Sequence, residues 1–165
     1  MRIPTLSAVT IVAGLLILAP ATQAHAAQSS PSPEIKGAYQ SWVTVLEAAK
    51  CDGTAVSREY TNDAVLIATF STYIKGRADL TKYFDTLTCN PNLTVKTDRI
   101  TTGRDGDMGY ATGLYTFSYT GKDGATVKVP ARFTFVFVDK DGRWVIANHH
   151  SSTQIAKVKG MKPFL

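Results

Sequence analysis

The 165-residue chain carries a formal net charge of +5 at pH 7, which is only mildly basic. It contains no basic stretch with interleaved aromatic residues, and the lysines near its end (Lys157, Lys159 and Lys162) are typical of a solvated tail. The sequence therefore argues against nucleic acid as a partner.

The first 26 residues have the pattern of a secretory signal peptide. Arg2 supplies a positive start, residues 11–19 form an apolar run, and Ala24 and Ala26 supply the small side chains of a cleavage site. A membrane anchor is the alternative, but the apolar run is shorter than the roughly 20 residues that a spanning helix needs. We expect cleavage after Ala26, export to a periplasmic or extracellular space, and no membrane association afterwards.

Cleavage at that point leaves 139 residues, a usual size for one domain. We expect a linker at 27–33, one domain at 34–155 and a C-terminal tail at 156–165. Cys51 and Cys89 are the two cysteines of the chain. Because pairing is the default in an oxidising compartment, we expect a disulfide between them, with free buried thiols or a redox pair as the alternatives.

Apolar periodicity predicts three helices ahead of the main sheet. Ser32 is a suitable N-cap for the first helix, and Pro33 suits its first position. Two shorter helices are expected at residues 54–60 and 77–87, with a short strand at 63–69 between them. The apolar stripe of the first helix recurs at steps of three and four residues in Ile35, Ala38, Tyr39, Trp42, Val45, Leu46 and Ala49.

The chain after Pro91 predicts a four-stranded meander. Turns as short as those expected at 103–106, 121–124 and 139–142 require antiparallel neighbours. The predicted fold class is therefore α+β, a cystatin-like cone with three N-terminal helices packed on a strongly curved antiparallel sheet. The strand candidates are residues 93–100, 108–120, 126–138 and 143–153.

Two features of this predicted sheet bear on function. Gly109 and Gly113 lie inside one strand, where glycine often marks a bend, and a bent sheet leaves a hollow against a helix. Val136 and Val138 make the following strand apolar on both faces. We therefore expect a second copy of the chain to cover the outer face, in a homodimer or a larger ring.

The last strand carries an unusual string of polar residues. Strict alternation places Asn148, His150 and Ser152 on one face, and His149 and Ser151 on the other. The adjacent histidines therefore cannot ligate one ion without a bulge, and we expect no metal site. Asn148 and His150 either project into the hollow or mark a strand that emerges into water.

Arg132 lies in mid-strand among core residues. A guanidinium binds a carboxylate in a bidentate way, so Arg132 is a candidate anchor for a polar or anionic ligand. The alternatives are an internal ion pair with Asp63 or Glu59, or a contact between subunits.

Aromatic hydroxyls supply further candidates. Tyr60, Tyr110 and Tyr115 either line the hollow or belong to the core, and Trp42 lies on the helix face that meets the sheet. The sequence has no Gly-rich phosphate loop, HExxH helix, GxSxG elbow or CxxC pair, and we expect no cofactor.

The chain resembles the nuclear transport factor 2-like superfamily, which includes the SnoaL-like domains. It is most similar there to bacterial proteins of the SgcJ/EcaC type, which are related to the association domain of calmodulin-dependent protein kinase II. Aligned on Trp144, His150 and Ser152 match a histidine and a serine of that association domain, whereas Asn148 stands in place of a further histidine. Arg132 is similar to the arginines that line the family's pocket. The segments that carry the resemblance are REYTNDAVLIATF, KGRADLTKYF, GLYTF, PARFTFVF and DGRWVIANHHSS.

The resemblance implies a cone-shaped fold, homo-oligomerisation through the sheet and a pocket inside the cone. It does not imply kinase activity, because the chain has no kinase domain. Relatives in the superfamily include isomerases, dehydratases and plain binding modules, so the fold alone does not select a function.

We therefore expect an exported, homo-oligomeric domain that binds a small polar or carboxylate-bearing molecule. The first alternative is a small isomerase or dehydratase that uses His150 as general acid or base. The second is an oligomerisation module whose interior is filled by its own side chains. The expected ligand residues are Arg132, His150, Asn148, Tyr110, Tyr60 and Trp42.

Overall fold

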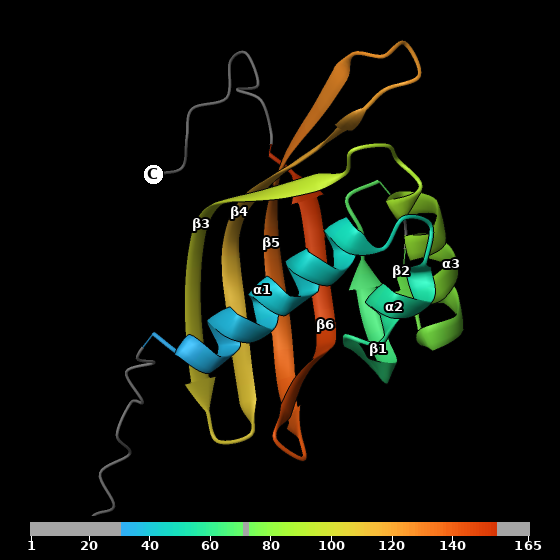
Figure 1. The fold of residues 1–165 in the computed structure, drawn as a ribbon. Helices are drawn as coiled ribbons and strands as arrows, with labels where there is room; N and C mark the ends of the chain where they lie inside the picture. The colour runs from blue at the N-terminus through green and yellow to red at the C-terminus, as the bar shows by residue number, and fades with distance from the viewer. Residues whose placement is uncertain (1–30, 71–72, 155–165) are drawn as a thin grey trace, which may run out of the picture.

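A computed structural model describes residues 31–70 and 73–154 of the chain, in which helices cover one face of a curved sheet (Figure 1). The expected signal peptide (1–26), most of the linker and the tail at 156–165 lie outside the described residues. No helix in the described part is long and apolar enough to cross a bilayer. In chain order the elements are α1 (Pro33–Ala48), α2 (Gly53–Ser57), β1 (Tyr60–Ile67), β2 (Tyr73–Lys75), α3 (Arg77–Thr88), β3 (Thr94–Asp105), β4 (Met108–Thr120), β5 (Thr126–Lys140) and β6 (Arg143–Thr153).

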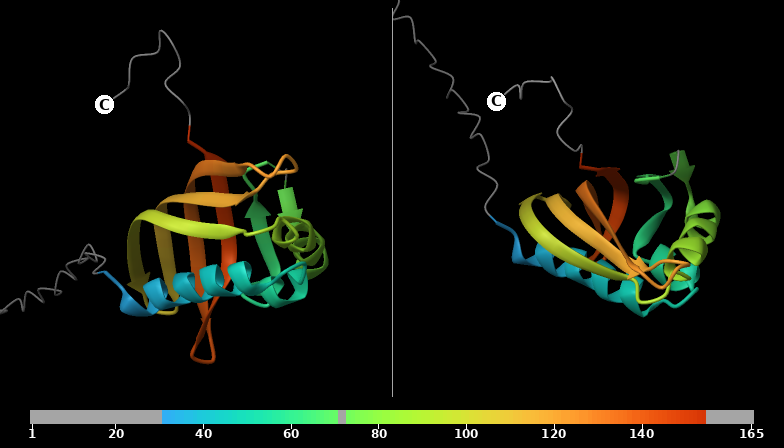
Figure 2. Two further views of the ribbon diagram at one scale, coloured as in Figure 1. Left: turned by 45° about the horizontal axis from the view of Figure 1, so that its top comes forward. Right: turned by 90° about the horizontal axis from the view of Figure 1, so that it is seen from above.

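The strands form one sheet in the order β2-β1-β6-β5-β4-β3. The predicted meander of β3 to β6 is confirmed, since each of these strands is antiparallel to the next. One detail differs, because β1 joins β6 in parallel and so makes the sheet mixed. Strand β2, which the sequence pattern did not predict, pairs with β1 and forms one edge. Seen from above, the sheet arches over α1, and α2 and α3 lie at the β1 end (Figure 2).

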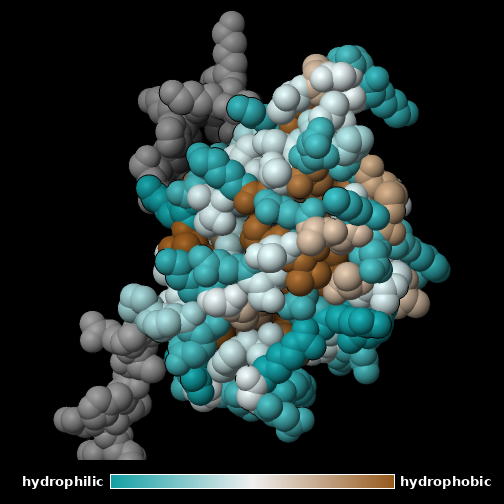
Figure 3. Space-filling view, in the orientation of Figure 1, coloured by the Kyte–Doolittle hydropathy of each residue, from teal (hydrophilic) through white to brown (hydrophobic). Residues whose placement is uncertain are grey.

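Helix α1 begins as its sequence predicts. The Ser32 hydroxyl accepts a hydrogen bond from the Ile35 amide at 3.3 Å, and Pro33 occupies the first turn. The helix buries its apolar stripe against the concave face of the sheet. The Tyr39 ring stacks on Phe133 with centroids 5.1 Å apart, and Trp42 meets Phe135 edge-on at 4.9 Å. The opposite side of α1 faces solvent, so this view of the molecule is largely hydrophilic, with apolar side chains showing between polar ones (Figure 3).

Two glycines of β4 allow the sheet to curve around the helix. A Cβ on Gly113 would collide with the carbonyl oxygen of Arg99, where β3 changes register between Thr97 and Arg99. A Cβ on Gly109 would collide with the Ile35 side chain of α1. The absence of side chains therefore permits both the bulge in β3 and the close approach of α1.

Helix α3 is fixed at both ends. At its start, the Arg77 guanidinium donates hydrogen bonds to the carbonyl oxygens of Ser57 (2.6 Å) and Tyr60 (2.9 Å). At its end, Cys89 forms the expected disulfide with Cys51, which follows α1. These attachments hold α3 beside the open end of the sheet.

We predict that the Cys51→Ser/Cys89→Ser double variant loses about 3–4 kcal/mol of unfolding free energy, because the bridge closes a loop of 38 positions. Urea unfolding followed by circular dichroism measures this loss. The same comparison between the oxidised and the reduced parent protein tests the bridge without any mutation. Equal midpoints for parent and variant would contradict a stabilising role for the bridge.

Candidate functional site

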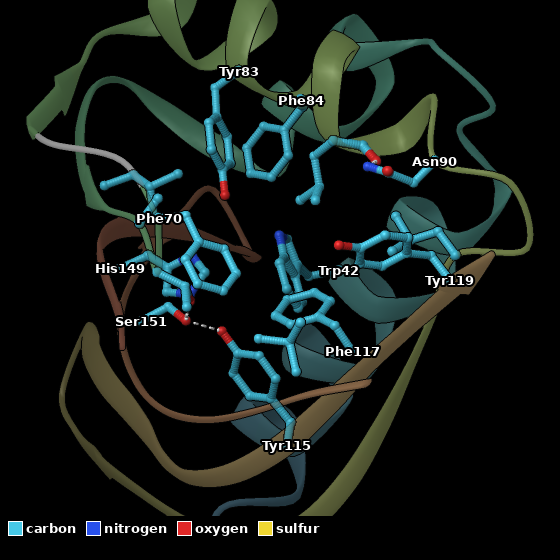
Figure 4. A pocket seen from close by; sticks show the side chains of 16 residues that line it. Trp42, Phe70, Tyr83, Phe84, Asn90, Tyr115, Phe117, Tyr119, His149 and Ser151 are labelled. Atoms are coloured by element: carbon cyan, nitrogen blue, oxygen red, sulfur yellow. Dashed lines mark hydrogen bonds between the residues drawn. The ribbon is translucent and has the colours of Figure 1, made fainter. Parts of the chain in front are cut away.

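A cavity of about 150 Å³ lies between α3, the Trp42 end of α1 and the concave face of the sheet. Its walls are predominantly aromatic, and none of the residues that line it carries a formal charge (Figure 4). The lining residues are Trp42, Leu66, Ala68, Thr69, Phe70, Tyr83, Phe84, Leu87, Asn90, Leu93, Tyr115, Phe117, Tyr119, Val129, His149 and Ser151.

His149 forms one wall of this cavity and is 3% exposed. Its ring stacks on Phe135 with centroids 3.8 Å apart and meets Trp42 edge-on at 5.4 Å. Its Nδ1 is hydrogen-bonded to the hydroxyl of Tyr60 at 2.9 Å. Burial lowers the pKa of His149 to about 3, with a smaller contribution from His150, so the imidazole is neutral at physiological pH.

Two buried polar atoms at this end of the cavity have no hydrogen-bond partner among the described residues. They are Nε1 of Trp42 and Nε2 of His149. Burial raises the pKa of Tyr60 well above its ordinary value, while the nearby Trp42 indole acts in the opposite direction. Such unpaired groups are rare in protein interiors and call for an explanation.

The hydroxyl groups of the neighbouring wall are satisfied by one another. Tyr115 donates a hydrogen bond to the Ser151 hydroxyl at 2.6 Å, and Ser151 is also hydrogen-bonded to Thr69. Burial raises the pKa of Tyr115, so this phenol keeps its proton. These hydroxyl groups can therefore contact a ligand, but they do not require a ligand to form hydrogen bonds.

The opposite side of the cavity comes from α3. Figure 4 shows the hydroxyl of Tyr83 pointing into the space, and burial raises its pKa to about 12. Phe70 lines the cavity although it is 75% exposed, so it marks the side that is open to solvent.

The six expected ligand residues are divided between two faces of the sheet. Trp42 lines the cavity, and Tyr60 lies directly behind it as the partner of His149. Tyr110, Arg132, Asn148 and His150 point away from the cavity, because their cross-strand partners belong to the outer row of β5 and β4.

A bulge at Ala147 explains why His149 and not His150 faces the cavity. Ile146 is paired with Phe137 but Asn148 with Val136, so β6 holds one extra residue between them. Ile146 and His149 therefore share the inner face, contrary to strict alternation along the strand.

Arg132 and His150 do lie close together, in a shallow groove on the outer face that Arg99 also lines. The Arg132 Nε donates a hydrogen bond to the Ser152 hydroxyl at 2.8 Å. No ion pair of Arg132 with Asp63 or Glu59 forms in the described structure, where Glu59 instead pairs with Arg143 at 2.9 Å. No group of three or more potential metal-ligating side chains occurs in the described part of the chain.

Residues 35–156 match the family model described as the SnoaL-like domain. The chain belongs to the SnoaL-like domain family. A search of curated proteins found no match for this SnoaL-like domain.

Solved structures with a similar fold include an association domain and proteins described as NTF2-like. A candidate calcium/calmodulin dependent protein kinase II association domain from Xanthomonas campestris is 30% identical, with a TM-score of 0.69 over 79% of this chain and 96% of that one. A candidate dehydratase of the NTF2-like family from Streptomyces avermitilis is 15% identical, with a TM-score of 0.67 over 74% and 96%. An NTF2-like protein with a cystatin-like fold from Novosphingobium aromaticivorans is 14% identical, with a TM-score of 0.61 over 73% and 79%. The two more distant structures support the fold alone.

We predict that His149 makes the SnoaL-like domain sensitive to mild acid. The unfolded chain binds a proton at this residue near pH 6.5, whereas the folded domain binds it only near pH 3. The contribution to stability is therefore fully present above pH 6.5 and decreases by up to about 1.4 kcal/mol per pH unit as the pH falls towards 3.

Urea unfolding of the parent and of the His149→Phe variant between pH 7 and pH 5 measures this effect. The parent should lose more stability than the variant over this range. His150→Gln is the matched control, because it removes the exposed neighbour on the outer face and retains the buried imidazole. Parallel pH profiles for the parent and His149→Phe would mean that His149 is not buried in neutral form.

Proposed function

We propose that this SnoaL-like domain binds one small, uncharged, ring-shaped molecule in the cavity behind Trp42. The observation that carries the proposal is an aromatic cavity with two buried polar atoms, on Trp42 and His149, that lack partners in the described chain. Its volume of about 150 Å³ is that of a cavity known to hold a benzene ring. The second alternative was an oligomerisation module. Its own side chains would fill the interior and leave no cavity of this size.

The charge of the cavity determines the charge of the ligand. None of its lining residues is Lys, Arg, Asp or Glu, and its histidine is neutral. Burial of a carboxylate without a cationic partner is costly. Arg132 faces the other side of the sheet and cannot supply that cation. We therefore propose a neutral ligand in place of the carboxylate-bearing one expected from the sequence.

The same chemistry favours binding over acid–base catalysis. A general acid or base works best when its pKa lies near the operating pH. Burial moves two pKa values at the cavity away from neutrality, to about 12 for Tyr83 and about 3 for His149. His150, the general acid or base of the enzyme alternative, lies on the outer face and outside this cavity.

We also propose that the domain self-associates through the outer face of the sheet. Two exposed apolar side chains are paired across β1 and β2 on this face, namely Ile67 (43% exposed) and Tyr73 (62%). Exposed apolar clusters of this kind mark contact surfaces. The relative from Xanthomonas campestris is described as an association domain, which supports the same proposal. Arg132, Asn148 and His150 would then belong to a contact between copies.

Export is the third part of the proposal. Its support is the signal-like pattern of residues 1–26 together with the Cys51–Cys89 disulfide, because structural disulfides persist mainly in oxidising compartments.

We predict that toluene at ten times its Kd raises the Tm of the parent by about 4 °C, because it fills the cavity of the folded state only. Benzoate, which has the same ring but carries a charge, should produce no such shift. Leu87→Trp should abolish the toluene effect by filling the cavity from α3. Leu114→Trp, the same change on the outer face, should retain it. Equal toluene-induced Tm shifts in the two variants would mean that toluene does not bind in this cavity.

We predict that Ile67→Lys shifts the domain towards monomer in analytical ultracentrifugation, because it places a charge on the outer apolar surface. Phe70→Lys is the matched control, since Phe70 is also exposed and apolar but lies on the cavity side. A parent that sediments as a monomer, or two variants that dissociate equally, would argue against association through this face.

A further inference from the structure

The cavity is polar at its buried end, although its walls are aromatic. The Trp42 indole nitrogen points into the space in Figure 4, and the edge of the His149 ring lies beside it, with ring centroids 5.4 Å apart. Both residues are more than nine-tenths buried, both line the cavity, and each carries one nitrogen atom without a partner among the described residues. The position of the two atoms indicates a single polar group of a ligand between them.

The hydrogen bond between His149 and Tyr60 determines what that polar group must be. If Tyr60 donates to Nδ1 of His149, the imidazole proton is on Nε2, and two N–H donors remain unpaired at the cavity. If Nδ1 donates instead, the Tyr60 hydrogen also lacks an acceptor among the described residues, and three groups remain unsatisfied. The first arrangement therefore costs less.

We propose that the ligand is a neutral one-ring molecule with a carbonyl oxygen, which accepts hydrogen bonds from Nε1–H of Trp42 and Nε2–H of His149. This inference rests on the proposed binding function and adds the chemical class of the ligand. One carbonyl oxygen has two lone pairs, which match two donors on adjacent rings. The attached ring lies against the aromatic walls.

Other oxygen groups match this end of the cavity less well. An alcohol or phenol brings a hydrogen atom of its own, and the nearest hydroxyl groups, on Tyr115, Ser151 and Thr69, already bond to one another. A carboxylate lacks a cation here. A hydrocarbon fills the volume but leaves both N–H groups without acceptors, at a cost in affinity.

Acetophenone and ethylbenzene are the probes that test the inference, because they have nearly the same shape and differ in the oxygen. Their Kd values for the parent are measured by isothermal titration calorimetry. Acetophenone should bind roughly tenfold more tightly than ethylbenzene, as expected for hydrogen bonds gained in a buried site. Trp42→Phe and His149→Phe should each reduce this preference severalfold, with binding followed by thermal shift. Trp144→Phe, a matched control outside the cavity, should retain the preference.

The outcomes separate the inference from the function on which it rests. If neither compound binds the parent, the proposed binding function fails and the inference fails with it. If both bind the parent with equal affinity, the cavity is a binding site but its polar end does not recognise a carbonyl oxygen.

A measurement on the parent alone makes the test independent of variants that fail to fold. In ¹⁵N-labelled protein, acetophenone should move the indole N–H signal of Trp42 downfield, and the Trp144 signal should stay in place. Ethylbenzene should produce no downfield shift. The same response of the Trp42 signal to both compounds would overturn the inference.

Discussion

The packing of α1 across the concave face of the bent sheet is the constraint on which the rest of the structure depends. Tyr39 and Trp42 contact Phe133 and Phe135 and thereby close the core along most of the helix. The sheet can bend towards the helix because Gly113 permits the bulge in β3. A space remains beside Trp42 under the sheet, and residues of α3 line it from the side. The cavity follows from this arrangement of two helices on one curved surface.

Burial at that cavity has two linked consequences for its chemistry. It keeps His149 neutral and Tyr83 and Tyr115 protonated, so the site offers hydrogen-bond donors without charge. It also makes every unpaired donor costly in the empty state. An acceptor supplied by a ligand would offset that cost, so the features that weaken an acid–base mechanism strengthen a binding role.

Local sequence signals predicted the elements that depend on local interactions. Ser32 and Pro33 identified the start of α1, and the turns after β4 and β5 fixed the bounds of Met108–Thr120 and Arg143–Thr153. The parallel pairing of β1 with β6 depends on residues about 80 positions apart, which no local pattern reveals.

The histidine of the site was predicted less well, because a single bulge decides which of the two histidines faces the cavity. Strict alternation brought His150 to the same face as Ile146, and the extra residue at Ala147 reversed this for His149 and His150. Trp42 was predicted to face the sheet interior and does so. A one-residue change of register moves every later side chain to the other face, so the ligand residues could not be assigned from periodicity alone.

The most direct test of the central claim is a crystal structure of the domain under xenon pressure. Xenon occupies dry apolar cavities without needing a hydrogen bond. The account predicts one strong xenon site in contact with Trp42, Phe84 and Tyr115, with the surrounding side chains unmoved. An interior without xenon there, with the rings of α1 and α3 packed against the sheet, would contradict it.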